Sequence, residues 1–591
     1  MISNTDIRYF FDTYYDNFMH SLSWEDHLLE PASREEWLAT LRACADDQQQ
    51  RCADNQILLE QYLYPLSSNP ALLSDEGYDL LLSFCRDFYY SNYTEPALLI
   101  RIIDILLPHY EDRSDTESLL FLYICAGFSY MELSRTGEPT SRDKTIYFYT
   151  KVLSYRDQIE FFESAASRDY IFIAYYNLIR VAPGLGILDI ETAYRLWEEL
   201  CQIRTMPKFC QYDTTNPRIP QLCDRAINDF RAYGAVLNVE RVIAPSAILS
   251  SLENMTQIYY SEILHERGSI YECPVFTVFN YHYVQARNGT ITWEAAWQIL
   301  DDYYVHKMQT IGQVSSPDLL AFYTNLPLNL IDVLGHTHFK EEFKQATYRR
   351  YRNLITSYLM NQPASLNSYT LNNGVQLVAF HPLILGTFQN RMEKMNFIVD
   401  LVVTRHLTTF THSVMVSYLA EAIGKHILAA RPELLRIPSS YLEGNVYASP
   451  AEVLDYIVPA ALFHDIGKNG MIPIINTQHR KLNDYEFNII QTHPQKGSDY
   501  LSSDPDFLIY QPVALGHHRS YDGTRGYPLS FDNTASPYRD AIDLIHICDC
   551  LDAATDYLSR NYHRAKPFDV VLNELKAGRG TEYNPDMVDV I

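Results

Sequence analysis

The sequence predicts an all-α protein in which an N-terminal helical region precedes a C-terminal helical bundle. Up to about residue 380, apolar and aromatic residues recur at three- and four-residue spacing in segments of helix length. Short polar breaks separate these segments, as in a series of consecutive helices. The chain has 591 residues, enough for several structural units with buried cores. We therefore expect a helical region over residues 1–380, in one or two subdomains, and a second domain over residues 395–591.

Four segments of the N-terminal region predict helices most clearly, at residues 116–137, 142–155, 167–181 and 189–203. Small and aromatic residues alternate in them in a way that weakly resembles tetratricopeptide-type helical hairpins. An irregular helical domain explains the pattern equally well, because tyrosine, which occurs 46 times, suits core and half-buried positions. The sequence thus predicts helices and leaves open whether they form a solenoid.

The composition disfavours several classes of protein. A formal net charge of −26 would repel duplex nucleic acid and anionic lipid from most of the surface. The 10 cysteines form no Cys-x-x-Cys pair, so neither a zinc ribbon nor a disulfide framework is predicted. The N-terminal residues lack a signal-peptide pattern, and no uninterrupted apolar stretch of about 18 residues follows them. We expect a cytoplasmic protein without a membrane span.

The best candidate for a linker is the turn-rich segment 361–375, which is followed by His381 and Pro382. Asparagine, serine, proline and glycine gather in this segment, as in loops that join domains. Every histidine and carboxylate that predicts catalysis lies C-terminal to it.

Several of these side chains lie on apolar faces of predicted helices. His412 is followed by Val416 and Leu419 at helical spacing, which places its imidazole on the buried face. His464 ends a similar apolar face, and Asp465 comes directly after it. Imidazole and carboxylate groups are therefore expected in the core.

The same pattern recurs further along the chain. His493, His517 and His518 each follow an apolar helical segment, and Asp549 lies where a core residue is expected. A single histidine of this kind is more often a core or surface residue than a ligand. A carboxylate buried alone, however, costs several kcal/mol. Together these groups predict one or two divalent metals, which would neutralise the carboxylates and bind the imidazole nitrogens.

Four motifs resemble those of the HD-GYP domain, a subgroup of the HD metal-dependent phosphohydrolase superfamily. They are ALFHDIGKNGMIP (461–473), KLNDYEFNIIQTHP (481–494), HHRSYDGTRGYP (517–528) and ICDCLDA (547–553). The subgroup is associated with cyclic di-GMP phosphodiesterases. The resemblance covers residues 395–591 and implies an HD-GYP helical bundle that hydrolyses cyclic di-GMP to the linear dinucleotide, to GMP, or to both.

The resemblance also implies a cofactor of two divalent metal ions, commonly iron or manganese. The implied metal ligands are His412, His464, Asp465, His493, His517, His518 and Asp549. Asp465 is implied to bridge the two metals, and Asp465 and Lys468 are the implied catalytic residues. The alternative for Asp465 is an N-cap of the following segment.

Substrate contacts are implied at Lys468, Tyr527, Arg560 and Arg564. Lys468 shares a helical face with His464 if the helix continues, and would contact the substrate phosphate; its alternative is an ordinary helix-end lysine. Tyr527 either stacks on a base or packs under its loop. The two arginines resemble guanine and phosphate contacts of the family, and a solvated surface face is an equal alternative for them.

Three departures from the family bear on function. Thr408 stands where trinuclear members have glutamate, which implies a dinuclear centre. Arg525 adds one residue to the signature loop and leaves the preferred cyclic dinucleotide open. The stretch between the first two histidine ligands is longer than in the family and includes the loop-like segment 437–450, interpreted as a lid or contact surface.

We therefore expect a cyclic di-GMP phosphodiesterase whose N-terminal helices sense a signal or bind a protein partner. One alternative is a phosphohydrolase of another cyclic dinucleotide or phosphoester. The other is a non-catalytic nucleotide-binding or interaction protein. The complete ligand set favours an enzyme, and the altered loop favours the non-catalytic alternative.

Overall fold

The computed structural model describes residues 2–27, 33–90, 95–162, 164–210, 217–236, 246–310, 316–362, 369–403, 405, 407–439, 446–471, 480–556 and 565–591. Within these residues the protein is helical, and extended pairing is limited to isolated bridges, which confirms the predicted all-α class. Among the described helices, none combines the length and the apolar character that a membrane crossing requires.

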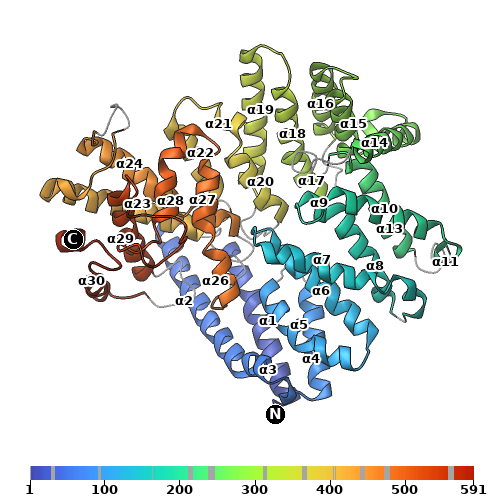
Figure 1. Ribbon diagram of the computed structural model, residues 1–591, viewed down its shortest axis with the longest axis horizontal. Coiled ribbons are helices and arrows are strands. Elements are labelled where there is room, and N and C mark those ends of the chain that lie inside the picture. Colours follow the sequence, from blue (N-terminus) through green and yellow to red (C-terminus); the bar gives the residue numbers. More distant parts are fainter. Residues whose placement is uncertain are drawn as a thin grey trace. The chain divides into compact units, whose positions relative to one another are not determined.

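The chain forms two compact units (Figure 1). The first comprises Met1–Arg8 and Tyr62–Tyr358, and the second comprises Tyr9–Gln61 and Leu359–Ile591. An N-terminal segment thus clusters with the C-terminal part of the chain. Contacts between such distant segments leave no local pattern in the sequence. The functional division at residues 380–395 stays a prediction.

Helices of the first unit pack mainly on their neighbours in the chain. They are α3 (Tyr64–Ser68), α4 (Asp75–Tyr90), α5 (Pro96–Asp112), α6 (Thr116–Ser134), α7 (Pro139–Leu153), α8 (Ala165–Tyr176), α9 (Ala182–Gly184), α10 (Ile190–Thr205), α11 (Pro207–Cys210), α13 (Arg218–Tyr233), α14 (Ser246–Arg267), α15 (Val275–Arg287), α16 (Trp293–Met308), α17 (Ser316–Tyr323), α18 (Asn325–Gly335) and α19 (Glu341–Met360). Helix α6 packs against α5 and α7, and α8 packs against α7 and α13. The four predicted helices correspond to α6, α7, α8 and α10, whereas a solenoid stays a prediction.

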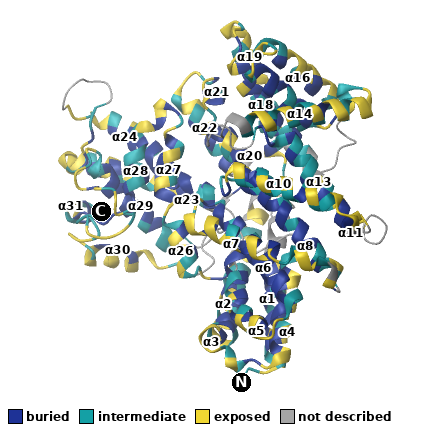
Figure 2. Ribbon diagram, turned by 45° about the vertical axis from the view of Figure 1, so that its right-hand side comes forward, coloured by how far each residue is buried: buried dark blue, intermediate teal, exposed yellow. Residues whose placement is uncertain are grey.

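Local sequence explains where two of these helices begin. The Asp115 side chain accepts a hydrogen bond from the backbone N–H of Ser118 (3.2 Å) at the start of α6. Asp189 accepts one from Thr192 (2.8 Å) at the start of α10. Such side chains satisfy backbone donors that a helix leaves unpaired at its first turn. Figure 2 shows that the helices bury one face and expose another.

Further helices make up the second unit. From Tyr9 onward it contains α1 (Asn4–His27), followed by α2 (Arg34–Leu58), α20 (Tyr369–Ala379), α21 (Pro382–Leu385), α22 (Arg391–Val403), α23 (Leu407–Ala430), α24 (Pro450–Phe463), α26 (Asp484–Ile490), α27 (His493–Leu501), α28 (Gln511–Gly516), α29 (Arg539–Thr555), α30 (Phe568–Ala577) and α31 (Pro585–Val590). Helix α23 packs against α24 and α29, and α28 packs against α24, α27 and α29. These helices form the bundle that carries the candidate site.

The predicted linker 361–375 is wrong in its second half, because α20 begins at Tyr369. Leu371, Val375 and Val378 are fully buried at helical spacing. Burial of this face overrides the turn preference of the asparagine and glycine residues in the segment. The first part of the predicted linker, at 363–368, lies outside the described residues.

The segment 437–450 is described only at its two ends, since residues 440–445 lie outside the described part. The backbone N–H of Ser439 donates to the carbonyl of Val446 (2.8 Å), and that of Ala448 donates to Ile437 (2.9 Å). The ends therefore pair antiparallel immediately before α24. A role for this segment as a lid or contact surface stays a prediction.

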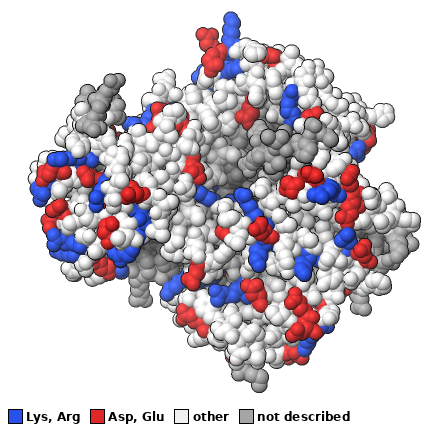
Figure 3. Space-filling view, in the orientation of Figure 1, with Lys and Arg blue, Asp and Glu red and all other residues white. Residues whose placement is uncertain are grey.

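Charged side chains are interspersed on the face shown in Figure 3. Many basic groups in the described part are paired with acidic ones, as in Arg231 with Glu262 (2.6 Å) and Arg204 with Asp224 (2.7 Å). Paired exposed charges of this kind add little to stability and leave little unbalanced positive charge. The expectation that duplex nucleic acid does not bind stays a prediction.

Candidate metal centre

The predicted ligands come from helices of the second unit that pack on one another. His412 lies in α23, His464 and Asp465 follow α24, His493 begins α27, His517 and His518 follow α28, and Asp549 lies in α29. All of these residues are buried except His518, whose side chain is 21% exposed. Side chains separated widely in the sequence therefore meet in the core of the bundle.

These residues form two adjacent groups that could each hold a metal ion. We call Asp465, His493, His517 and His518 the first group, and His412, His464 and Asp549 the second group. In each group, one ligand atom from every residue lies within 4.8 Å of the others. The structure thus brings every predicted ligand into one place.

Asp465 lies between the two groups. Its Oδ1 is 3.0 Å from Nε2 of His493 and 3.6 Å from Nε2 of His517. Its Oδ2 is 3.5 Å from Nε2 of His412 and 3.5 Å from Nε2 of His464. One carboxylate oxygen therefore faces each group, which is the arrangement that a bridging ligand requires.

The Nδ1 atoms of three histidines are held by backbone carbonyls outside the cluster. The Nδ1 of His464 contacts the carbonyl of Ala461 (2.6 Å), and that of His493 contacts the carbonyl of Ile490 (2.7 Å). The Nδ1 of His517 contacts the carbonyl of Ala514 (2.9 Å). Because Nδ1 must donate its proton to these acceptors, Nε2 carries the lone pair that faces the cluster.

Unpaired buried atoms fit bound cations. Nε2 of His412, Nε2 of His464 and Oδ1 of Asp465 are buried and make no hydrogen bond. A buried polar atom without a partner is costly, and imidazole and carboxylate groups are the donors that Zn²⁺, Fe²⁺ and Mn²⁺ accept. The residues present therefore fit a pair of divalent metals.

Electrostatics in the cluster favour the protonation states that metal ligands need. Burial raises the pKa of Asp465 and Asp549, but Lys468 beside Asp465 and His412 beside Asp549 hold the two pKa values well below their usual range. Burial lowers the pKa of His464 to about 3 and also lowers the pKa of His493. Ionised carboxylates beside neutral imidazoles form a donor set ready for a cation.

His412 differs from the other histidines. Burial lowers its pKa, but the adjacent carboxylates of Asp549, Asp552 and Asp465 outweigh burial and raise the pKa to about 9. A proton and a metal ion would therefore compete for the Nε2 of this imidazole.

Lys468 lies in a 3-10 turn, Ile466–Met471, rather than on a continuation of α24 as expected. The helix ends at Phe463, and the tighter turn places residues three positions apart on the same side. The Lys468 Nζ is accordingly 2.5 Å from Oδ2 of Asp465, three residues earlier. The lysine thus adjoins the carboxylate that lies between the two groups.

Gly467 permits the close approach that places Asp465 beside His493. A Cβ at this position would lie 1.9 Å from the carbonyl oxygen of His493 and 2.5 Å from the backbone nitrogen of Gly497. Any larger residue would push the 3-10 turn away from α27. The glycine is therefore part of the geometry of the site.

The signature loop closes back on the histidine pair. The backbone N–H of Tyr527 donates to the carbonyl of His518 (3.3 Å), and the two rings lie with centroids 4.6 Å apart. Arg525, the added residue, pairs with Glu582 at 3.3 Å. Tyr527 thus packs on a candidate ligand, and base stacking by this residue stays a prediction.

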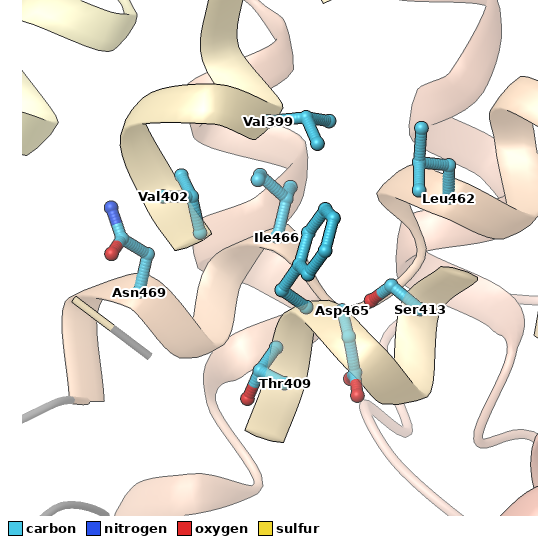
Figure 4. Close-up of a pocket in the computed structure, with 9 residues that line it drawn as sticks. Val399, Val402, Thr409, Ser413, Leu462, Asp465, Ile466 and Asn469 are labelled. Carbon is cyan, nitrogen blue, oxygen red and sulfur yellow. The ribbon is translucent and has the colours of Figure 1, made fainter. Parts of the chain in front are cut away.

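A small cavity of ≈ 20 Å³ adjoins the cluster and is lined mostly by apolar side chains from α22, α23 and α24 (Figure 4). Figure 4 shows Val399 and Ile466 on one side, while the Asp465 carboxylate points away from them, to the same side as the Thr409 hydroxyl. The apolar wall of the cavity therefore lies on the side of Asp465 that is away from its carboxylate.

Some predicted positions lie outside the described part of the structure. Arg560 and Arg564 fall within residues 557–564, for which no position is described. The backbone of Thr408 lies in α23, but its side chain is not among those described. The predictions at these residues are therefore untested.

Sequence reasoning missed two buried residues that contact the candidate ligands. Oδ2 of Asp552 lies 2.6 Å from Nδ1 of His412. Nδ1 of His546 lies 2.6 Å from the carbonyl oxygen of His517. A signal existed for Asp552, because it follows Asp549 by three residues and shares its helical face. His546 precedes Asp549 by three residues and gave the same signal, but the sequence could not show that its partner is a backbone atom of a distant segment.

All candidate ligands lie in one region that resembles a known domain. Residues 409–560 match the family model of the HD domain. This match confirms the predicted resemblance at the level of the HD superfamily. The narrower HD-GYP assignment depends on the sequence motifs and is a proposal.

Curated relatives extend the comparison. A cyclic di-GMP phosphodiesterase of Vibrio cholerae is 26% identical over 45% of this chain. The cyclic di-GMP phosphodiesterase response regulator RpfG of Xanthomonas campestris is 32% identical over 24%, and the 3'3'-cGAMP-specific phosphodiesterase 2 of Vibrio cholerae is 25% identical over 34%. The chain spans 58%, 36% and 36% of their respective lengths.

Proposed function

We propose that this chain is a metal-dependent HD-GYP phosphodiesterase that hydrolyses cyclic di-GMP to the linear dinucleotide, to GMP, or to both. The observation that carries the proposal is the position of Asp465, with one oxygen facing each group of candidate ligands. Relatives named as cyclic di-GMP phosphodiesterases support the substrate.

Two divalent metals would be held by the first and second groups, with Asp465 between them. When bound, such metals activate a water and bind the oxygens of a phosphate diester. The donor set of nitrogen and oxygen atoms suits iron or manganese, which we propose as the metals. The chain's own contribution is to orient four of the imidazoles through Nδ1, those of His412, His464, His493 and His517, and to keep the carboxylates ionised.

Lys468 is the proposed phosphate-binding residue. Its Nζ adjoins Asp465, and an ammonium group there would attract a phosphodiester and offset negative charge that develops during cleavage. Tyr527, Arg560 and Arg564 are proposed as further substrate contacts. A protein partner of the N-terminal helices stays a prediction.

Another cyclic dinucleotide is the second candidate substrate. One relative is named for 3'3'-cGAMP, and Arg525 lengthens the loop that packs on His518. A panel of cyclic di-GMP, 3'3'-cGAMP and cyclic di-AMP, assayed with the same metal-loaded protein, separates these substrates by their kcat/KM values.

The proposal is tested with purified full-length protein loaded with Mn²⁺ or, without oxygen, Fe²⁺. We expect hydrolysis of cyclic di-GMP, measured by chromatography of the products, and a loss of at least 100-fold in Asp465→Ala. Asp499→Ala is the control, because Asp499 is an exposed carboxylate on α27, the helix that carries His493. Tight binding of cyclic di-GMP without turnover under every metal condition would instead support the non-catalytic alternative.

A further inference from the structure

The second group contains a contact that the first group lacks. Oδ2 of Asp552 lies 2.6 Å from Nδ1 of His412, and both side chains are buried. An ionised carboxylate only accepts hydrogen bonds, so Nδ1 carries a proton and Nε2 of His412 is the nitrogen that a metal ion would bind in place of a proton. That Nε2 makes no hydrogen bond and lies 3.0 Å from Oδ1 of Asp549.

The corresponding histidines of the cluster have neutral partners. The Nδ1 atoms of His464, His493 and His517 contact backbone carbonyls. A carboxylate behind an imidazole raises the basicity of the opposite nitrogen more than a carbonyl does, and it holds the ring more firmly. Among the described contacts of these rings, His412 therefore has the strongest support as a ligand.

Charge differs between the two groups in the same direction. Asp552 adds a negative charge directly behind the second group. Lys468 lies 2.5 Å from Oδ2 of Asp465, the oxygen that faces the second group, and so offsets part of this negative charge. Because both groups are buried, these charges are only weakly screened. The charge of Asp552, directly behind a ligand of the second group, therefore favours a divalent cation in that group.

We infer that Asp552 is a positioning residue that makes the two metal positions unequal, so that the position formed by His412, His464 and Asp549 binds its cation more tightly and fills first. The inference rests on the metal centre of the proposed function. It adds an order of loading and a residue that determines it.

Metal-free protein titrated with Mn²⁺ tests the inference. Equilibrium dialysis with elemental analysis should reveal two classes of site in the wild type. In Asp552→Asn the tighter class should weaken 10- to 100-fold while the weaker class keeps its affinity. At limiting Mn²⁺, electron paramagnetic resonance should show one uniform site in the wild type. In Asp552→Asn it should show ions shared between both positions.

Two further variants separate electrostatic and structural effects. Asp543→Asn removes another buried carboxylate of α29 that is not within either group, and should leave both classes unchanged. Lys468→Met should tighten the class of site that Asp552→Asn weakens, because the Lys468 Nζ lies beside the Asp465 oxygen that faces the second group. Thermal unfolding of each metal-free variant verifies that it is folded.

An Asp552→Asn isotherm identical to that of the wild type would overturn the inference, as would an equal weakening of both classes in a folded variant. Either result would leave the proposed function intact, since two Mn²⁺ ions would still bind to the wild type. A wild-type protein that binds no Mn²⁺ or Fe²⁺ would instead overturn the proposed function together with the inference.

Discussion

Individual side chains of the cluster are oriented by what they contact on the side away from it. Backbone carbonyls hold His464, His493 and His517, and a carboxylate holds His412. Each contact selects the tautomer in which Nε2 faces the cluster. The cluster is therefore preorganised by short contacts, made within three or four residues for the first three rings.

Asp543 provides a pH-dependent prediction at the same scale. Burial raises its pKa from 3.8 to about 6, although Asn584 and Arg539 lower it in part. Between these values the folded chain keeps a proton that the unfolded chain has lost, so this residue's contribution to the free energy of unfolding falls as pH rises from about 4 to about 6. The fall amounts to about 3 kcal/mol at most.

Asp543→Asn removes this titration. The free energy of unfolding of the variant, relative to the wild type, should therefore rise by about 2–3 kcal/mol between pH 4 and pH 7. Chemical unfolding of metal-free protein, followed by circular dichroism at each pH, measures the difference. A difference that is constant over this range would contradict the prediction.

At the scale of elements, the 3-10 turn after α24 and the start of α27 determine where Asp465 lies. Gly467 and Gly497 let the backbones of the two segments approach each other. Lys468 points back toward Asp465 because a 3-10 helix has three residues per turn. Periodicity predicted the helices on both sides, but it predicted a continued helix where the chain forms this turn. Backbone packing against a distant helix decided the difference.

Gly467→Ala should displace the turn from α27. A Cβ 1.9 Å from the His493 carbonyl cannot be accommodated without backbone movement, which costs about 1–3 kcal/mol. We expect Mn²⁺ affinity to fall at least 10-fold, measured by the same dialysis. Gly470→Ala is the matched control in the same turn, because its Cβ would meet only the ends of the Tyr500 and Lys496 side chains.

At the scale of the whole molecule, the second unit joins Tyr9–Gln61 to Leu359–Ile591. In the N-terminal part of this unit, Phe10, Tyr14 and Phe18 of α1 are buried. The HD match alone covers residues 409–560 and would suggest a self-contained C-terminal domain. The compact unit is larger than the region that resembles the family.

A fragment that begins at Leu359 should therefore be less stable than the full chain. Loss of residues 9–61 would leave part of the unit incomplete and expose apolar surface to water. We expect a lower midpoint of thermal unfolding and a tendency to aggregate in size-exclusion chromatography. The prediction would be refuted by a fragment that is monodisperse and unfolds at the same temperature as the corresponding transition of the full chain.

Metal removal should also lower the stability of the second unit. A cation that binds the folded chain only, present at 100 times its Kd, stabilises it by about 2.7 kcal/mol. Dialysis against a chelator should therefore lower the temperature of one unfolding transition by several degrees, and added Mn²⁺ should restore it. Asp465→Ala, which lacks the carboxylate between the two groups, should show a smaller response.

The sequence by itself determined the helical class, the residue types of the candidate ligands and the faces on which they lie. These properties depend on local periodicity and on motif order, as for His412 on the apolar face of α23. Tertiary structure alone decided that Asp465 faces both groups, that Asp552 supports His412, and that residues 9–61 belong with the C-terminal bundle. The physical reason is that these contacts join segments far apart in the chain, where local spacing carries no information about distance.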